Sequence, residues 1–158
     1  MSRSVERFRA ALAAAGLADT ITELDAHART AQQAAEALGC EVGQIVKSLV
    51  FADADGNPLL VLAAGDVRVD ERRVGRLHGA PVSLGGAGFV REVSGYAIGG
   101  VPPFGHRRAL PALVDRSLDR HARLWAAAGT PRHVFSLAPV ELLATARGQW
   151  SEVGDPPA

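Results

Sequence analysis

The stretch Val46-Lys-Ser-Leu-Val-Phe-Ala-Asp-Ala-Asp-Gly-Asn-Pro-Leu-Leu-Val-Leu-Ala-Ala64 decides the fold of this chain. It holds two apolar runs, Val46–Ala52 and Pro58–Ala64, with the turn-forming residues Asp55-Gly56-Asn57 between them. Apolar runs of this length on either side of such a turn predict a β-hairpin. Because both runs are apolar at successive positions, we expect other layers to cover both faces of the hairpin.

Helical and strand-like segments surround this hairpin. Apolar residues at helical spacing from Val5 to Ala15 predict a first helix that ends near Gly16. Thr30 is the expected N-cap of a helix over Ala31–Leu38, with Gln33 completing a capping box. The other expected segments are two helices, one loop with a short helix, five short strands and a loose tail: Asp70–Leu77, Ala138–Ala146, Pro81–Val93, Ile21–Leu24, Leu110–Val114, Arg123–Ala128, His133–Leu137, Gln149–Val153 and Gly154–Ala158. Together they predict one compact α+β domain over residues 1–158.

The composition is that of an ordinary globular protein. Apolar residues make up 47% of the 158 residues, yet no apolar run approaches the roughly 18 residues of a membrane span. The 17 basic residues balance the 17 acidic ones, which argues against a surface that coats nucleic acid broadly but leaves room for a local basic patch. The single cysteine, Cys40, excludes an internal disulfide. With no signal-peptide pattern at the N-terminus, we expect a cytoplasmic protein.

Lys47 stands out within the first strand of the hairpin. Side chains alternate along a strand, so Lys47 shares a face with Leu49 and Phe51. On that face it either reaches the sheet edge or lines a pocket, and dry burial would lower its pKa. The alternative is a solvated lysine at the start of a strand.

The loop Gly95-Tyr-Ala-Ile-Gly-Gly-Val-Pro-Pro-Phe-Gly-His106 holds four glycines and two prolines. Glycine lets backbone N–H groups approach a ligand closely, and proline stiffens the path that holds them. By composition alone, a functional loop and a plain connection between core elements are equally good interpretations.

Several common kinds of site are missing from the sequence. The five histidines show no HxxxH, HxH or Cys/His pairing, so we expect neither a metal nor another cofactor. GxSxG, Walker A and GxGxxG patterns are absent as well, which removes the simplest hydrolase and nucleotide-binding assignments. Gly85-Gly86-Ala-Gly88 is expected to lack the strand-to-helix setting of a phosphate cradle. Asp115 either faces a site or caps the turn Ser117–His121.

Taken in order, these segments resemble the YbaK/prolyl-tRNA synthetase-associated domain family over nearly the whole chain. The most specific match is the lysine-bearing strand followed by the loop G-x-x-x-G-G-V-x-P-F-G. The stretches that carry the resemblance are Thr30–Gly39, Gln44–Phe51, Leu62–Asp66, Val69-Asp70, Gly95–Gly105, Leu113–Leu118, Ala128-Gly129 and Leu137–Leu143. The resemblance implies a single compact α+β domain with a curved mixed sheet flanked by helices, working without metal.

The resemblance also implies trans-editing, which is hydrolysis of an amino acid wrongly ester-linked to a tRNA, often the tRNA for proline. Its partners would be an aminoacyl-tRNA and an aminoacyl-tRNA synthetase. No association with a membrane is expected. Lys47, Gly99 and Gly100 would be catalytic. The substrate-binding positions would be Thr30, Ser48, Gly95, Pro103, Gly105, Asp115, Gly129 and His133.

Two departures from the family pattern leave the substrate open. Pro102 stands where a serine is common, and Ala127 or Ala128 stands where an asparagine often precedes the glycine. We expect a small aminoacyl group, which means alanyl, cysteinyl or seryl. One alternative is a non-catalytic module that binds a tRNA acceptor end or a protein partner, and another is a small-molecule hydrolase unconnected with tRNA.

Overall fold

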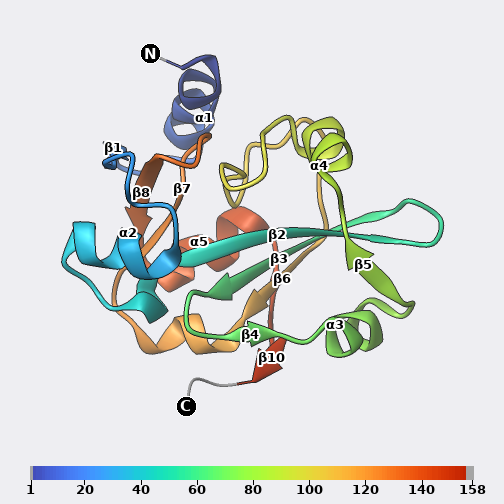
Figure 1. Cartoon of the computed structure of the whole chain (residues 1–158). Helices are drawn as coiled ribbons and strands as arrows, with labels where there is room; N and C mark the ends of the chain where they lie inside the picture. Colours follow the sequence, from blue (N-terminus) through green and yellow to red (C-terminus); the bar gives the residue numbers. More distant parts are fainter. Residues whose placement is uncertain (1, 156–158) are drawn as a thin grey trace.

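The computed structural model describes residues 2–155, and its centre is the expected hairpin (Figure 1). Strands β2 (Val46–Asp53) and β3 (Pro58–Ala64) pair antiparallel with Lys47 opposite Ala63. The Asp53 carboxylate closes the turn by accepting hydrogen bonds from the backbone N–H groups of Asp55 and Asn57. The turn residues therefore act as their types predict.

The hairpin forms the middle of a five-stranded sheet with the order β5-β2-β3-β6-β9. The outer strands are β5 (Val82–Leu84), β6 (Ala112–Asp115) and β9 (Gln149–Ser151). Strand β5 runs antiparallel to β2, whereas β3, β6 and β9 are mutually parallel. The sheet is therefore mixed, and the expected α+β class is confirmed.

Helices and the C-terminal segment cover the two faces of this sheet. Helices α1 (Arg3–Ala14), α4 (Ala87–Ser94) and α5 (Pro139–Ala146) pack their apolar residues against one face. Helix α3 (Glu71–His78) and Val153 pack against the other face. Burial on both sides explains why β2 and β3 are apolar at nearly every position.

A second, smaller sheet lies beside the first. It joins β1 (Thr22–Glu23), β8 (His133–Leu137) and β7 (Leu124–Ala127) in that order, all antiparallel. Helix α2 (Ala31–Leu38) packs next to it, and the predicted capping box of Thr30 and Gln33 is present. A single parallel bridge between Ile45 and Trp125 links the two sheets. Two short 3₁₀ helices, η1 (Val42–Gln44) and η2 (Arg116–Arg120), complete the connections.

The structure corrects two sequence-based expectations. Residues 81–93 contain strand β5 before helix α4, so Gly85-Gly86 does lie in a strand-to-helix turn. The tail was expected to be loose, yet β10 (Gly154–Asp155) pairs with β4 (Arg68–Val69), while residues 156–158 lie outside the described part. Pairs this short leave no periodic signal in a sequence. Among residues 2–155, no helix has the length and apolar character needed to cross a bilayer.

Candidate functional site

A cleft of about 310 Å³ runs along an open edge of β2. Strand β5 pairs only with Phe51–Asp53, and β7 reaches this edge through the single bridge from Trp125 to Ile45, so the part of β2 between these two contacts has no strand neighbour there. Helix α2, the glycine-rich loop and the β7–β8 hairpin surround this open part of the edge. The cleft is lined by Leu24, Ala28, Arg29, Thr30, Ala31, Ala34, Ile45, Val46, Lys47, Ser48, Leu49, Ile98, Gly99, Trp125, Ala126, Ala127, Pro131 and Val134.

The open edge presents backbone polar groups to the cleft. The carbonyl of Val50 accepts a hydrogen bond from Gly85 N–H across this edge. Because N–H and C=O groups alternate sides along a strand, those of Ser48 point to the same edge, beyond the bridge that Trp125 makes with Ile45. Ser48 Oγ is also buried and has no hydrogen-bond partner within residues 2–155. The site therefore contains polar groups available to a ligand along with its apolar walls.

Lys47 extends from β2 on the face that carries Leu49 and Phe51, as expected. Its Nζ donates a hydrogen bond to the Val67 carbonyl oxygen at 2.8 Å. Burial lowers the pKa of this ammonium, and the nearby carboxylates of Asp115 and Asp66 oppose that effect. Lys47 thus lines the cleft while its ammonium group is hydrogen-bonded to the Val67 carbonyl. It is also the only lysine in the chain.

Asp115 lies outside the cleft lining and is 4% exposed. Its Oδ2 accepts from the Ala64 N–H and its Oδ1 accepts from the Ser117 N–H, both at 3.0 Å. The carboxylate therefore caps η2 and fixes the end of β3. Its effect on the cleft is electrostatic, through Lys47, and it does not line the cavity.

Only part of the glycine-rich loop reaches the cleft. Gly99 does so, with a φ of 86° that disfavours other residues. Gly100 instead locks the loop in place: its N–H donates to the Ala97 carbonyl, and its own carbonyl accepts from Gly129 N–H. A Cβ at Gly100 would lie 2.6 Å from the Thr130 Cα. The N–H of Gly100 is therefore already occupied, whereas that of Gly99 donates to no other group of residues 2–155.

Three other glycines on the predicted list contact helix α1. The Gly95 carbonyl accepts a hydrogen bond from Arg7 Nη2. A Cβ at Gly105 would lie 2.7 Å from Ala11 Cβ, and one at Gly129 would lie 2.7 Å from the Ser4 carbonyl oxygen. Pro103 is buried near them and does not line the cleft. These residues position the loop and the hairpin turn.

The structure thus brings Lys47, Gly99, Thr30 and Ser48 to one cleft. Of the other predicted residues, His133 lines a neighbouring cavity. The remaining six lie outside the cleft lining: Gly95, Gly100, Pro103, Gly105, Asp115 and Gly129. Sequence reasoning missed the apolar wall, including Leu24, Trp125 and Val134, because apolar residues in strands and loops look like ordinary core.

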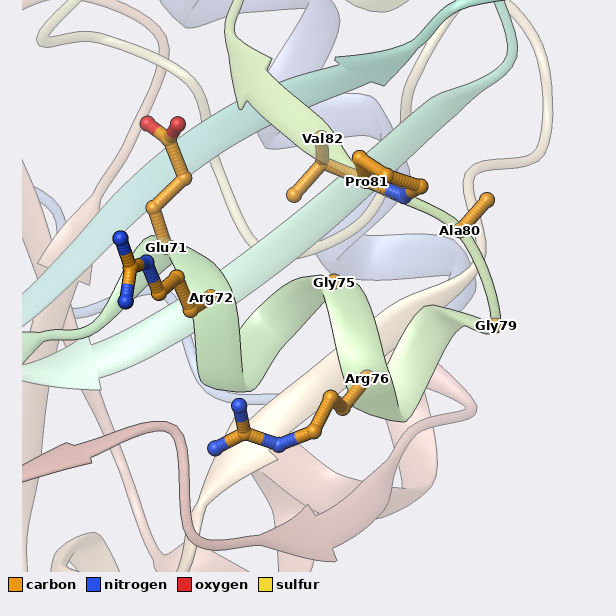
Figure 2. Close-up of a pocket in the computed structure, with 8 residues that line it drawn as sticks. All are labelled: Glu71, Arg72, Gly75, Arg76, Gly79, Ala80, Pro81 and Val82. Carbon is orange, nitrogen blue, oxygen red and sulfur yellow. The ribbon is translucent and has the colours of Figure 1, made fainter.

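A larger cavity than the cleft lies elsewhere, and none of the predicted residues line it. It has a volume of about 760 Å³ and is lined by residues of α3 and by residues 79–82, which lead into β5. Figure 2 shows Arg72 and Arg76 extending from α3, with Pro81 and Val82 opposite. Gly75 of the helix and its C-cap Gly79 are among the residues that line this cavity. Over residues 2–155, no three His, Cys, Asp or Glu side chains gather as metal ligands.

The sequence and the fold are similar to those of several known proteins. The Bacillus subtilis protein YwhH is 33% identical over 122 residues, covering 77% of this chain and 78% of its own. "Putative Cys-tRNA(Pro)/Cys-tRNA(Cys) deacylase EbsC" of Enterococcus faecalis is 26% identical over 125 residues, covering 78% and 76%. A crystal structure described as a "putative trans-editing enzyme for prolyl tRNA synthetase" superimposes with a TM-score of 0.93 at 44% identity, covering 99% of both chains.

The family of this chain follows from a family model that matches more than half of it. The model for the aminoacyl-tRNA editing domain matches residues 25–145, which include α2, the hairpin, the glycine-rich loop and all the cleft-lining residues except Leu24. The residues that surround the open edge of β2 therefore belong to the matched region. This chain is a member of the aminoacyl-tRNA editing domain family.

Proposed function

We propose that this protein is a trans-editing deacylase that removes a small, wrongly attached amino acid from tRNA. Water adds to the ester carbonyl carbon, the bond from that carbon to the ribose oxygen breaks, and the ribose oxygen takes up a proton. The products are the free amino acid and a tRNA with its terminal hydroxyl restored. Membership of the editing-domain family supports this reaction, as do the names of the Enterococcus relative and of the similar crystal structure.

The observation that carries the proposal is the meeting of Lys47 and Gly99 in one cleft. An aminoacyl ester is already activated, so the protein needs to orient it and to stabilise the negative charge that develops on the carbonyl oxygen. The Gly99 N–H is a donor without a protein partner within residues 2–155. A positioned donor of this kind contributes about 3 kcal/mol to lowering the barrier. The Lys47 ammonium would hold the terminal phosphate or ribose, or the oxyanion itself.

The cleft lining favours a small aminoacyl group. Ala31, Ala34 and Ala127 are among the residues that line it, and Ala127 is one of the two candidates, with Ala128, for the position where the family often has an asparagine. Pro102, the other departure from the family pattern, is buried outside the lining. We therefore expect alanyl, cysteinyl or seryl esters as substrates. A single methylene changes discrimination by only about 1–3 kcal/mol, so selection among these three will be limited.

The first prediction concerns Lys47. Purified protein should deacylate at least one member of a panel of alanyl-, cysteinyl-, seryl- and threonyl-tRNAs. The Lys47→Ala variant should lose about 100-fold or more in kcat/KM, as expected when a preorganised stabilising group is removed. Circular dichroism should show an unchanged fold. Arg72→Ala is the matched control, because it removes one positive charge from the separate cavity on α3 (Figure 2).

Each outcome of this panel separates the proposal from its alternatives. Full turnover by Lys47→Ala would remove that residue from the mechanism. Binding of tRNA without turnover would favour a non-catalytic module, and activity that uncharged tRNA cannot inhibit would favour a small-molecule hydrolase. The neutral net charge implies only modest, salt-sensitive affinity for tRNA alone. An aminoacyl-tRNA synthetase is accordingly the partner we expect in the cytoplasm.

A further inference from the structure

A second cavity of about 570 Å³ adjoins the cleft. Ala28, Arg29 and Pro131 line both spaces, so the two lie side by side. The second cavity lies between β1, the loop that leads to α2, and the β7–β8 turn, on the side of the molecule where Figure 1 shows β1, β8 and α2. Its walls carry the charged or polar side chains of Glu23, Arg29, Arg132 and His133.

Glu23 and His133 form one wall of this cavity. They are cross-strand partners in the β1–β8 pair, and Glu23 Oε1 lies 3.9 Å from His133 Nε2. The other ring nitrogen, Nδ1, lies 2.6 Å from Thr130 Oγ1, which fixes the plane of the imidazole. The Glu23 side chain is 58% exposed, so its carboxylate remains able to accept further hydrogen bonds.

Arg29 and Arg132 supply donors to the same cavity. Arg132 Nε donates to the Leu24 carbonyl at 3.2 Å, and Arg29 Nε donates to the Ala26 carbonyl at 3.4 Å. These bonds hold the stems of both side chains near the cavity. The terminal Nη atoms of both arginines form no ion pair within residues 2–155, so they can donate to a ligand.

This set of groups matches a particular kind of ligand. A carboxylate acceptor beside guanidinium donors complements a base edge that carries an amino group and carbonyl or ring-nitrogen acceptors, and carboxylates pair with the N4 amino group of cytosine. Proteins that read single-stranded RNA also stack splayed bases on histidine rings and guanidinium planes. The cleft itself offers Trp125 as a stacking surface for a larger base.

We propose that this second cavity binds the cytosine that precedes the terminal adenosine of the single-stranded tRNA 3′ end, with Glu23 accepting from its N4 amino group. The proposal rests on the proposed function, which places the aminoacyl ester and its adenosine in the adjoining cleft. The shared lining residues Ala28, Arg29 and Pro131 would then lie between the two nucleotides. The protein would then recognise the 3′ end beyond the reacting nucleotide.

The test changes the base and its acceptor together. Alanyl-tRNA ending in cytidine–adenosine is compared with alanyl-tRNA ending in uridine–adenosine, since uracil carries a carbonyl where cytosine carries its amino group. Wild-type protein should prefer the cytidine substrate on the order of tenfold in kcat/KM. Glu23→Gln should lose most of this preference, because its amide group can donate to uracil. Glu152→Gln, an exposed acidic residue outside both cavities, is the matched control and should behave as wild type.

Two further measurements make the outcome decisive. The alanyl ester of adenosine alone leaves the second cavity empty, so wild type and Glu23→Gln should hydrolyse it at equal rates. A loss by Glu23→Gln on this short substrate would place Glu23 at the adenosine and overturn the proposal, as would equal activity of wild type on the two tRNAs. Fluorescence anisotropy with uncharged tRNAs measures the same base preference without turnover. A preference in binding with no deacylation would defeat the proposed reaction while supporting the cytosine site.

Discussion

At the scale of single residues, two opposing effects set the pKa of the Lys47 ammonium. Removal from water disfavours its charged form, whereas the carboxylates of Asp115 and Asp66 favour it. Burial is the larger effect, so the pKa lies below that of an ordinary lysine. The bond to the Val67 carbonyl satisfies one of its three donors, which leaves donors for a ligand in the cleft.

The second prediction measures this pKa directly. Since Lys47 is the only lysine, protein labelled with ¹³C-lysine gives a single set of side-chain signals that report its titration. The midpoint should fall below the ordinary value of about 10.4. Asp115→Asn should lower it further because a favourable charge is lost, and Asp119→Asn, on the exposed side of η2, should leave it unchanged. A midpoint at or above the ordinary value would mean that the ammonium remains hydrated.

Residue patterns predicted the face on which Lys47 lies, and they did so for a physical reason. Side chains alternate along a strand, so Lys47 must share a face with Leu49, two positions away. The same reasoning could not identify its neighbours, because Val67 and Asp115 approach from other strands and turns. For Asp115, capping the following turn was one of the two interpretations, and the structure confirms it.

At the scale of elements, α1 docks on positions where the glycine-rich loop and the β7–β8 turn lack side chains. Gly105 faces Ala11 and Gly129 faces the Ser4 carbonyl, each at a distance that excludes a Cβ atom. Both glycines also have positive φ values, 81° and 112°. The loop composition therefore reflects close packing against a helix as much as access to a ligand.

The third prediction separates crowding from backbone strain. Gly105→Ala and Gly56→Ala introduce the same side chain at nearly the same φ, 81° and 79°, but nothing lies within 4 Å of a Cβ at Gly56. Gly56→Ala should cost about 1–2 kcal/mol of unfolding free energy from the left-handed backbone alone. Gly105→Ala should cost about 1–3 kcal/mol more because its Cβ would lie 2.7 Å from Ala11 Cβ on helix α1. Urea denaturation measures both, and adding Ala11→Gly should recover part of the extra loss.

Elements with strong local signals were predictable and very short ones were not. Both hairpins and helices α1, α2, α3 and α5 lie where periodicity, caps and turn residues placed them. The pairing of β4 with β10 involves two residues from each strand and a glycine without a Cβ, so its origin is tertiary. The open edge of β2 is equally invisible in the sequence, because it depends on where β5 stops pairing.

At the scale of the whole molecule, the cleft exists because two sheets meet without merging. The five-stranded sheet supplies Lys47 and Ser48, and the three-stranded sheet supplies Trp125 and Val134. Lys47 lies on a hairpin that is packed on both faces. Its position therefore depends on the stability of the entire domain. The far end of the hairpin is fixed by a contact between Asp53 and His78, at the end of α3.

The fourth prediction concerns this contact and the stability of the domain in acid. His78 Nε2 lies 3.0 Å from Asp53 Oδ2, and this hydrogen bond, followed by those from Asn57, holds the pKa of the Asp53 carboxyl well below its usual range. A carboxyl with a lowered pKa in the folded state stabilises it fully above the unfolded value of about 3.9, and this stabilisation is lost as pH falls through the folded value. Unfolding free energy from urea titrations should therefore decline below about pH 4. In Asp53→Asn the domain should be less stable at pH 7 and the decline shallower, whereas Asp55→Asn in the same exposed turn should follow wild type. Parallel curves for wild type and Asp53→Asn would show that the hairpin end and α3 are held together by packing alone.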